Sequence, residues 1–147
     1  MTAEPLTIVL AEDDEGHAEL IRMNLARAQI LNQIVHLPDG QAALEYIRRE
    51  GPYAGRPQGS LILLLDINMP RLDGIETLRQ LKADPKTAKI PVIMLTTTDN
   101  PREIERCYEL GCNVYITKPV EYNRFCDALR ELGLFLQFVR VPNEAEE

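Results

Sequence analysis

Cysteine, basic charge and long hydrophobic runs are all scarce in this 147-residue sequence. Its three cysteines form no CxxC pair and no His/Cys spacing typical of zinc ligands, and their odd number does not suggest a disulfide framework. A formal net charge of -7 argues against binding the nucleic-acid backbone, because that requires clustered Lys and Arg. The apolar run near the N-terminus is too short for a signal sequence or a membrane span, so we expect a cytoplasmic protein that does not enter membranes.

The composition is that of a soluble globular protein, with 45% hydrophobic and 27% charged residues. The chain is long enough to bury one core without disulfides or a structural metal. We therefore expect a single domain over residues 1–147, with its core at about 6–138 and a frayed acidic tail at 142–147.

Apolar runs rich in Ile, Val and Leu predict five strands. The central runs are apolar throughout, as expected when helices cover both faces of a parallel sheet. The predicted strands are residues 6–12, 33–37, 61–67, 90–97 and 114–117. Helical patterns separate them, at about residues 15–28, 40–50 and 74–83, between a cap at Asn100 and a stop at Gly111, and from 121 onward.

Strict alternation of strand and helix predicts an α/β fold with a doubly wound parallel sheet, whose ligands lie outside the carboxyl ends of the strands. In the common strand order 2-1-3-4-5, strands one, three, four and five are neighbours. Each of these four strands is followed by charged or hydroxyl residues that could form a binding or catalytic site. The residues are Glu12, Asp13 and Asp14 after the first, Asp66 after the third, Thr96 to Thr98 after the fourth and Lys118 after the fifth.

Each of these residues has an ordinary structural explanation when taken alone. Asp14 is interpreted as a helix cap, Asp73 can start a helix, and Asp66 can be a turn residue at a strand end. Thr96 favours a strand and Lys118 can be a solvated surface cation. Together these explanations do not account for three acids and one lysine gathering at one edge of a sheet.

The segment "LILLLDINMP" runs from a deeply apolar strand into Asp66, and burying an ionised carboxylate without a partner is costly. Crowded carboxylates repel one another and so favour a bound cation; hard oxygen ligands with free coordination sites favour Mg²⁺. Mg²⁺, Lys118 and the Thr96 hydroxyl can together stabilise a transferring phosphoryl group. The pattern therefore predicts that Asp66 forms an aspartyl phosphate.

The segments "AEDD", "LDINMPRLDG", "PVIMLTT" and "YITKP" occur in this order and resemble the signatures of the response-regulator receiver domain of two-component signalling. The resemblance implies a flavodoxin-like fold of five parallel strands, with Asp66 as the phosphoacceptor. It also implies a Mg²⁺ site made by Glu12 (through water), Asp13, Asp66 and the backbone carbonyl of Asn68.

The same resemblance implies three further roles. Thr96 matches the switch hydroxyl, Tyr115 the aromatic switch, and Lys118 the site's cation, which precedes a proline whose bond is usually cis. The implied function is a phosphorylation switch for protein–protein interactions, with a sensor histidine kinase as donor. Such a protein catalyses its own phosphorylation and dephosphorylation and is not an enzyme in the usual sense.

A finer resemblance, to receivers paired with bacterial phytochromes, rests on "EDDEGHAELI", "REIERCYELGCNVYITKPVEY" and "LGLFLQFV". It implies a phytochrome-type kinase; a relay receiver for another kinase is the alternative. A flavodoxin-like electron carrier would need a Ser/Thr/Gly loop to cradle the flavin phosphate, whereas "AEDDEGH" would repel it. A phosphohydrolase would place two acids around the nucleophile, which "LDINMP" does not. His17 and His36 are interpreted as structural or surface residues.

The last predicted helix has more apolar residues than one core-facing stripe needs. Phe125, Leu129, Leu132, Leu136 and Val139 recur at helical spacing and can face the core. The remaining apolar residues, Leu134, Phe135, Phe138 and Val141, fall on other faces. An exposed patch of this kind predicts a homodimer through Leu134, Phe135 and Phe138. Alternatively, the helix breaks at Gly133 and these residues pack on the chain's own sheet.

Overall fold

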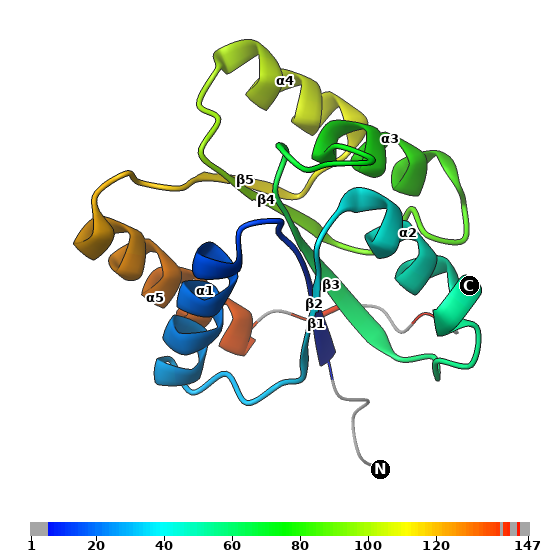
Figure 1. Ribbon diagram of the computed structural model, residues 1–147, viewed down its shortest axis with the longest axis horizontal. Helices are drawn as coiled ribbons and strands as arrows, with labels where there is room; N and C mark the ends of the chain where they lie inside the picture. The colour runs from blue at the N-terminus through cyan, green and yellow to red at the C-terminus, as the bar shows by residue number, and fades with distance from the viewer. Residues whose placement is uncertain (1–5, 139, 142–143, 145–147) are drawn as a thin grey trace.

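The computed structural model describes residues 6–138, 140–141 and 144. Five strands form one parallel sheet in the order β2-β1-β3-β4-β5, which confirms the predicted α/β topology (Figure 1). The strands are β1 (Leu6–Ala11), β2 (Ile34–Leu37), β3 (Ser60–Leu65), β4 (Val92–Thr96) and β5 (Val114–Thr117). The helices are α1 (Glu15–Arg27), α2 (Gly40–Arg48), the short 3-10 helix η1 (Gly51–Tyr53), α3 (Gly74–Ala83), α4 (Pro101–Leu110) and α5 (Tyr122–Phe138).

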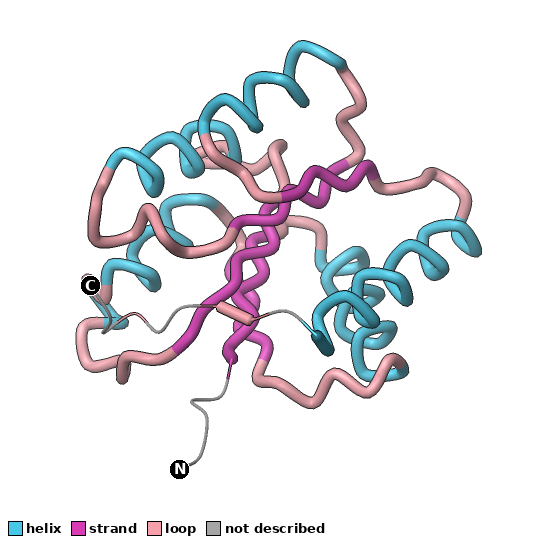
Figure 2. The backbone as a smooth tube through the Cα atoms, turned by 180° about the vertical axis from the view of Figure 1, so that it is seen from behind, coloured by secondary structure: helices cyan, strands magenta, loops and turns pink. Residues whose placement is uncertain are grey.

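Helices cover both faces of the sheet, with α1 and α5 on one side and α2, α3 and α4 on the other (Figures 1 and 2). Along β1, Ile8 and Leu10 pack in the cluster with α1 and α5, while Val9 and Ala11 pack in the cluster on the opposite face. Successive side chains of a strand point to opposite faces, so a strand covered on both sides is apolar throughout.

Three capping residues place the helices as the sequence predicts. Asp14 caps α1 by accepting the amide of His17 at 2.9 Å, and Asp73 caps α3 through the amide of Glu76 at 2.9 Å. Asn100 caps α4 through the amide of Arg102, also at 2.9 Å. Each side chain satisfies one of the amides that the first turn of a helix leaves without a partner.

Several boundaries differ by a few residues from the sequence prediction. β3 ends at Leu65 instead of residue 67, because Asp66 Oδ1 accepts the amide of Ile67 at 2.7 Å and the chain turns there. α2 ends at Arg48 because Arg49 adopts a left-handed conformation, with φ of 56°. The 3-10 helix η1 is not among the predicted elements.

α5 passes through Gly133 without a break, so the alternative in which the helix ends there is wrong. A Cβ at this position would lie 2.5 Å from the Cβ of Ala28, so glycine allows α5 to approach α1 closely. The predicted core residues are buried where the structure describes them, and Val139 lies outside the described residues. The buried ones are Phe125, Leu129, Leu132 and Leu136, whereas Leu134, Phe135 and Phe138 are 50%, 48% and 80% exposed and Val141 is half-buried.

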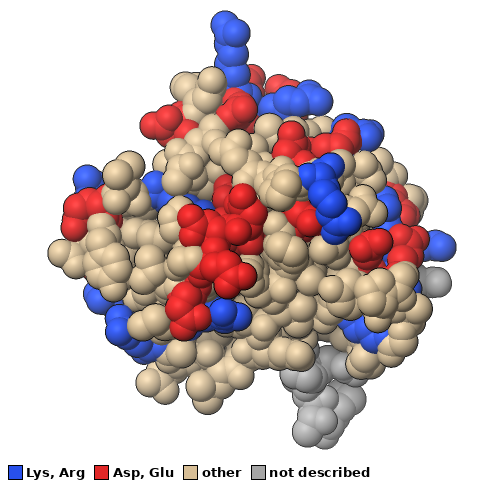
Figure 3. All heavy atoms as spheres, viewed as in Figure 1, with Lys and Arg blue, Asp and Glu red and all other residues tan. Residues whose placement is uncertain are grey.

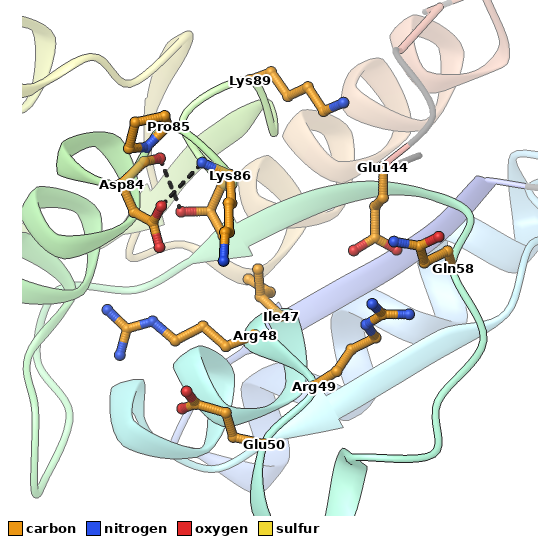
Figure 4. A pocket seen from close by; sticks show the side chains of 11 residues that line it. Ile47, Arg48, Arg49, Glu50, Gln58, Asp84, Pro85, Lys86, Lys89 and Glu144 are labelled. Carbon is orange, nitrogen blue, oxygen red and sulfur yellow. Dashed lines mark hydrogen bonds between the residues drawn. The ribbon is translucent and has the colours of Figure 1, made fainter. Parts of the chain in front are cut away.

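Glu144 is the single residue of the predicted acidic tail that the structure describes, and its side chain is held rather than frayed. Its carboxylate accepts two hydrogen bonds from Arg56, at 2.9 and 3.0 Å, and one from the amide of Gly59 at 3.0 Å. Glu144 also lines a hollow of about 830 Å³ beside the carboxyl end of α2 (Figure 4). Among the described residues, no helix is both long and apolar enough to cross a membrane.

Candidate functional site

Three carboxylates meet at the carboxyl edge of the sheet. Oxygen atoms of Glu12, Asp13 and Asp66 all lie within 4.8 Å of one another. The pairing of β1 with β3 matches Ala11 to Leu65, and this register brings the acids that follow each strand side by side. Acidic side chains gather over the region where β1 leads into α1 (Figure 3). The predicted convergence of these three acids is therefore confirmed.

Lys118 supplies the positive charge within this cluster. It follows β5, its side chain is 1% exposed, and Nζ donates to Glu12 Oε1 and, at 3.4 Å, to Asp66 Oδ2. The amide of Lys118 donates to the carbonyl of Thr96 at 2.6 Å and so fixes it to the end of β4. A buried ammonium requires partners of opposite charge, and here it also offsets the charge of Asp66.

Burial raises the pKa of the Glu12 carboxyl to about 7. The hydrogen bond and charge of Lys118 act in the opposite direction, and the neighbouring charge of Asp66 adds to the rise. Glu12 is 1% exposed, whereas Asp13 is exposed. The cluster thus combines one solvent-facing carboxylate with two buried ones, a set that suits a cation reached from solvent.

His17 and His36 lie at the site, although the sequence alone favours structural or surface roles for them. The Nδ1 atom of His17 lies 3.2 Å from Lys118 Nζ. The Nε2 atom of His36 lies 2.7 Å from the backbone carbonyl of Glu12. The sequence carries one signal for His17, because this residue stands three positions after the cap Asp14 and so in the first turn of α1, at the same edge of the sheet.

The two predicted switch residues, Thr96 and Tyr115, do not bond to each other directly; both form hydrogen bonds with the backbone of Thr98. Thr96 is fully buried at the end of β4, and its Oγ1 accepts the amide of Thr98 at 3.4 Å. The hydroxyl of Tyr115 donates to the carbonyl of Thr98 at 2.6 Å. Burial raises the pKa of Tyr115 to about 12. The loop after β4 is therefore held by both side chains.

Asn68 joins the loop after β3 to the loop after β4. Its side-chain amide donates to Thr98 Oγ1 at 3.2 Å. The loop after β3 is also tied to the start of α2, because Arg71 donates to both carboxylate oxygens of Asp39, at 2.8 and 3.0 Å. Arg71 has φ of 63°, a left-handed conformation that costs roughly 1–2 kcal/mol and that this two-pronged ion pair helps to offset.

One implication of the family resemblance is wrong. The described residues contain no cis peptide bond, so the bond between Lys118 and Pro119 is trans. The trans form is the intrinsically favoured one for a bond before proline, by about 0.5–1 kcal/mol.

The fold and this cluster define a class of signalling domain, and the comparison with family models agrees. The model described as the response regulator receiver domain matches residues 8–130, and the chain belongs to this family. The module is a phosphoacceptor of two-component signalling rather than a classical enzyme.

Relatives of known identity include phytochrome response regulators. Response regulator Rcp1 of Synechocystis sp. is 38% identical over 114 residues, which cover 78% of this chain and 77% of Rcp1. A crystal structure of a response regulator receiver domain from Rhodospirillum rubrum is 48% identical, with a TM-score of 0.85 over 92% of this chain and 96% of that one. The phosphorylated cyanobacterial phytochrome response regulator RcpA is 33% identical, with a TM-score of 0.86 over 96% and 99% of the two chains.

Proposed function

We propose that this protein is a cytoplasmic response regulator that accepts a phosphoryl group on Asp66 from a sensor histidine kinase of the phytochrome type. The observation that carries the proposal is the contact of buried Lys118 with Asp66 inside a cluster of three carboxylates. The description of the similar protein RcpA as a phytochrome response regulator supports the phytochrome partner. A relay receiver for another kinase is the alternative.

The acidic cluster fits a divalent metal, and we propose Mg²⁺. Asp13 and Asp66 would be direct ligands, Glu12 would act through water, and the backbone carbonyl of Asn68 would complete the protein's share. Such oxygen donors suit Mg²⁺, which also keeps several waters in its shell. A crystal structure of the relative Rcp1 is described as the Mn²⁺-bound form, which supports a divalent cation here. When bound, the ion would neutralise negative charge on the transferring group.

The transfer itself needs a nucleophile and fixed positive charge. A carboxylate oxygen of Asp66 forms a bond to phosphorus while the P–N bond of the donor phosphohistidine breaks, and the leaving imidazole keeps the electron pair and takes up a proton. The ammonium of Lys118 stabilises negative charge on the phosphoryl oxygens, and the hydroxyl of Thr96 donates to one of them.

Phosphorylation would change the surface through Thr96 and Tyr115. Drawing the Thr96 hydroxyl toward the phosphoryl group moves the loop after β4, which the Tyr115 hydroxyl holds through the carbonyl of Thr98. The two side chains then act as one element with two positions. A Thr96→Ala variant should still be labelled on Asp66 but should lose the change in partner affinity that phosphorylation causes in the parent; a normal change would contradict the switch.

The phosphoacceptor role is tested with acetyl phosphate and Mg²⁺, which need no kinase. Mass spectrometry of the parent should show one added phosphate that is stable in acid, labile in base and located on Asp66. Asp66→Asn is the matched control, because it keeps the size of the side chain and removes the nucleophile; equal labelling of this variant would overturn the assignment. Asp13→Asn should weaken Mg²⁺ binding, measured by calorimetry.

The phytochrome partner is tested separately with purified kinases. A phytochrome-type histidine kinase should transfer phosphate to the parent faster than unrelated histidine kinases do under the same conditions. Equal or slower transfer would favour the relay alternative.

We also propose that the protein forms a homodimer through α5. Leu134, Phe135 and Phe138 are about half or more exposed on this helix. Phe135 also borders an apolar hollow of about 260 Å³ whose other lining includes Ile93, Val114, Ile116 and Leu132. A second copy with the same surface would cover these side chains in a closed two-fold pair.

Light scattering tests the dimer. The double variant Phe135→Glu/Phe138→Glu should be a folded monomer at concentrations where the parent is a dimer. Leu31→Glu is the control, because Leu31 is 86% exposed and lies outside α5. A parent that is monomeric at tens of micromolar, with and without phosphorylation, would exclude the homodimer.

A further inference from the structure

We propose that His17 is a positioning residue for phosphoryl transfer: its Nδ1 atom holds the ammonium of Lys118 at the phosphoacceptor. This inference rests on the proposed role of Asp66 and extends it to a residue that is not one of the three clustered acids.

The ammonium of Lys118 has three neighbouring acceptors on the described part of the chain. They are Glu12 Oε1, Asp66 Oδ2 at 3.4 Å and His17 Nδ1 at 3.2 Å. An ammonium has three N–H donors and no acceptor, so this set uses all of them. Because the Lys118 side chain is 1% exposed, water has little access to replace an acceptor that is lost.

The same geometry determines how the imidazole of His17 carries its proton. Since Lys118 only donates, the Nδ1 atom that faces it must present a lone pair, and the ring proton then lies on Nε2. His17 therefore acts as an acceptor beside two carboxyl groups.

The ring of His17 is held from two directions. Its backbone amide donates to the cap Asp14 at 2.9 Å, which fixes it in the first turn of α1. Its edge packs against Phe125 of α5, with 5.7 Å between ring centroids and an angle of 78°. Phe125 is 5% exposed, so the imidazole packs against a buried side chain.

Unlike the other two acceptors, His17 has no proposed role in phosphoryl transfer other than holding Lys118. Asp66 is the proposed nucleophile and Glu12 is a proposed member of the metal site, so both carboxylates have roles other than holding Lys118. His17 remains available as an acceptor throughout. Fixing the ammonium matters because its charge must already be in place when negative charge develops on the phosphoryl group.

Two variants separate the acceptor from the ring. The substitution His17→Asn introduces a side-chain amide whose Oδ1 can occupy the place of the imidazole Nδ1, so the acceptor is kept and the ring is lost. The substitution His17→Phe keeps an aromatic ring against Phe125 and loses the acceptor.

The rate of Asp66 phosphorylation by acetyl phosphate should fall about tenfold to 150-fold in His17→Phe, the loss expected for one hydrogen bond to a charged group. His17→Asn should stay within about threefold of the parent, since its acceptor is retained. Equal losses in both variants would show that the ring and not the acceptor matters, and would overturn the proposal.

A second measurement needs neither metal nor phosphate and stands even if a variant folds poorly. Nitrogen NMR of the metal-free parent should show His17 with its proton on Nε2 and an unprotonated Nδ1. Lys118→Met should remove this preference, because the donor that imposes it is gone. A proton on Nδ1 in the parent would contradict the inferred hydrogen bond.

The outcomes for His17 and for the proposed function can be told apart. If the parent is not labelled on Asp66, the proposed function fails and the rate comparison has no basis, while the NMR measurement still decides the hydrogen bond. If the parent is labelled and His17→Phe is labelled at the same rate with normal thermal unfolding, the positioning role alone is overturned.

Discussion

At the scale of single residues, the site is governed by charges that are buried together. Lys118 and Glu12 are 2% and 1% exposed, and each depends on the other to offset the loss of water. Burial nevertheless leaves the pKa of Glu12 raised to about 7. A carboxyl that titrates near neutral pH links both metal binding and stability to the proton concentration.

Mg²⁺ binding should therefore weaken as the pH falls below about 7. A metal site needs its carboxylates ionised, so a proton must leave Glu12 as the ion binds, and affinity should drop by up to roughly tenfold per pH unit. Calorimetric titrations between about pH 6 and 8 measure this dependence. Glu12→Gln is the control and should show a flatter profile; an unchanged slope would show that another group titrates.

The metal-free protein should lose stability as the pH rises from about 4.5 to about 7. In this window the folded state, with the raised pKa of Glu12, binds a proton that the unfolded chain has released. Stability falls with pH wherever the folded state binds more protons, so this contribution is largest at the acidic end and levels off above about pH 7. Urea unfolding of the parent and of Glu12→Gln at several pH values separates the contribution of Glu12 to stability from that of the other acidic residues.

At the scale of elements, the site depends on how closely the start of α3 approaches the end of β3. The amide of Gly74 donates to the carbonyl of Ile67 at 2.8 Å. A Cβ at Gly74 would lie 2.0 Å from the carbonyl oxygen of Asp66, which is backbone and cannot move aside. The φ of Gly74 lies outside the left-handed range, so its backbone conformation does not require glycine. Glycine is required here because only a residue without a Cβ can come this close to the backbone of Asp66.

Gly74→Ala should lower the free energy of unfolding by about 2–4 kcal/mol, because an added methyl group in a packed contact forces the backbone to shift. Chemical denaturation measures the loss, and labelling by acetyl phosphate should fall with it as Asp66 moves. Gly55→Ala is the matched control, since a Cβ there would meet no atom within 4 Å. A Gly74→Ala protein as stable as the control would contradict the close approach.

At the scale of the whole molecule, an ion pair joins two distant parts of the chain. Arg56 and Glu144 are 88 residues apart, and their side chains are 8% and 11% exposed. The guanidinium of Arg56 also donates to the carbonyls of Tyr46 and Ile47 and lies 4.6 Å from the ring centroid of Tyr46. These contacts fix the orientation of the Arg56 guanidinium, and its remaining N–H groups bind the carboxylate of Glu144.

Glu144→Ala should lower the free energy of unfolding by about 1–3 kcal/mol, since it removes hydrogen bonds to a charged and largely buried group. Glu109→Ala, at an exposed position of α4, should change it by less than about 0.5 kcal/mol. Urea denaturation of the two variants provides the comparison. Equal stability of Glu144→Ala and Glu109→Ala would show that the ion pair contributes nothing.

The sequence by itself determined the elements and the edge at which the chemistry lies. Apolar runs and caps such as Asn100 act on neighbouring residues, so a strand or a helix start can be predicted locally. Glu12, Asp13, Asp66 and Lys118 follow strands that end at one edge in any parallel sheet, and the common strand order 2-1-3-4-5 makes those strands neighbours, so their convergence could be predicted.

Only the tertiary structure decided which side chains touch across that edge. His17 and Lys118 are 101 residues apart, and their 3.2 Å contact depends on where the first turn of α1 lies relative to the end of β5. The same is true of Glu144, whose place in an acidic stretch predicts a frayed tail, and of the exposed side chains of α5. Such contacts arise from the relative placement of whole elements, which packing of the core sets and which no local pattern of residues encodes.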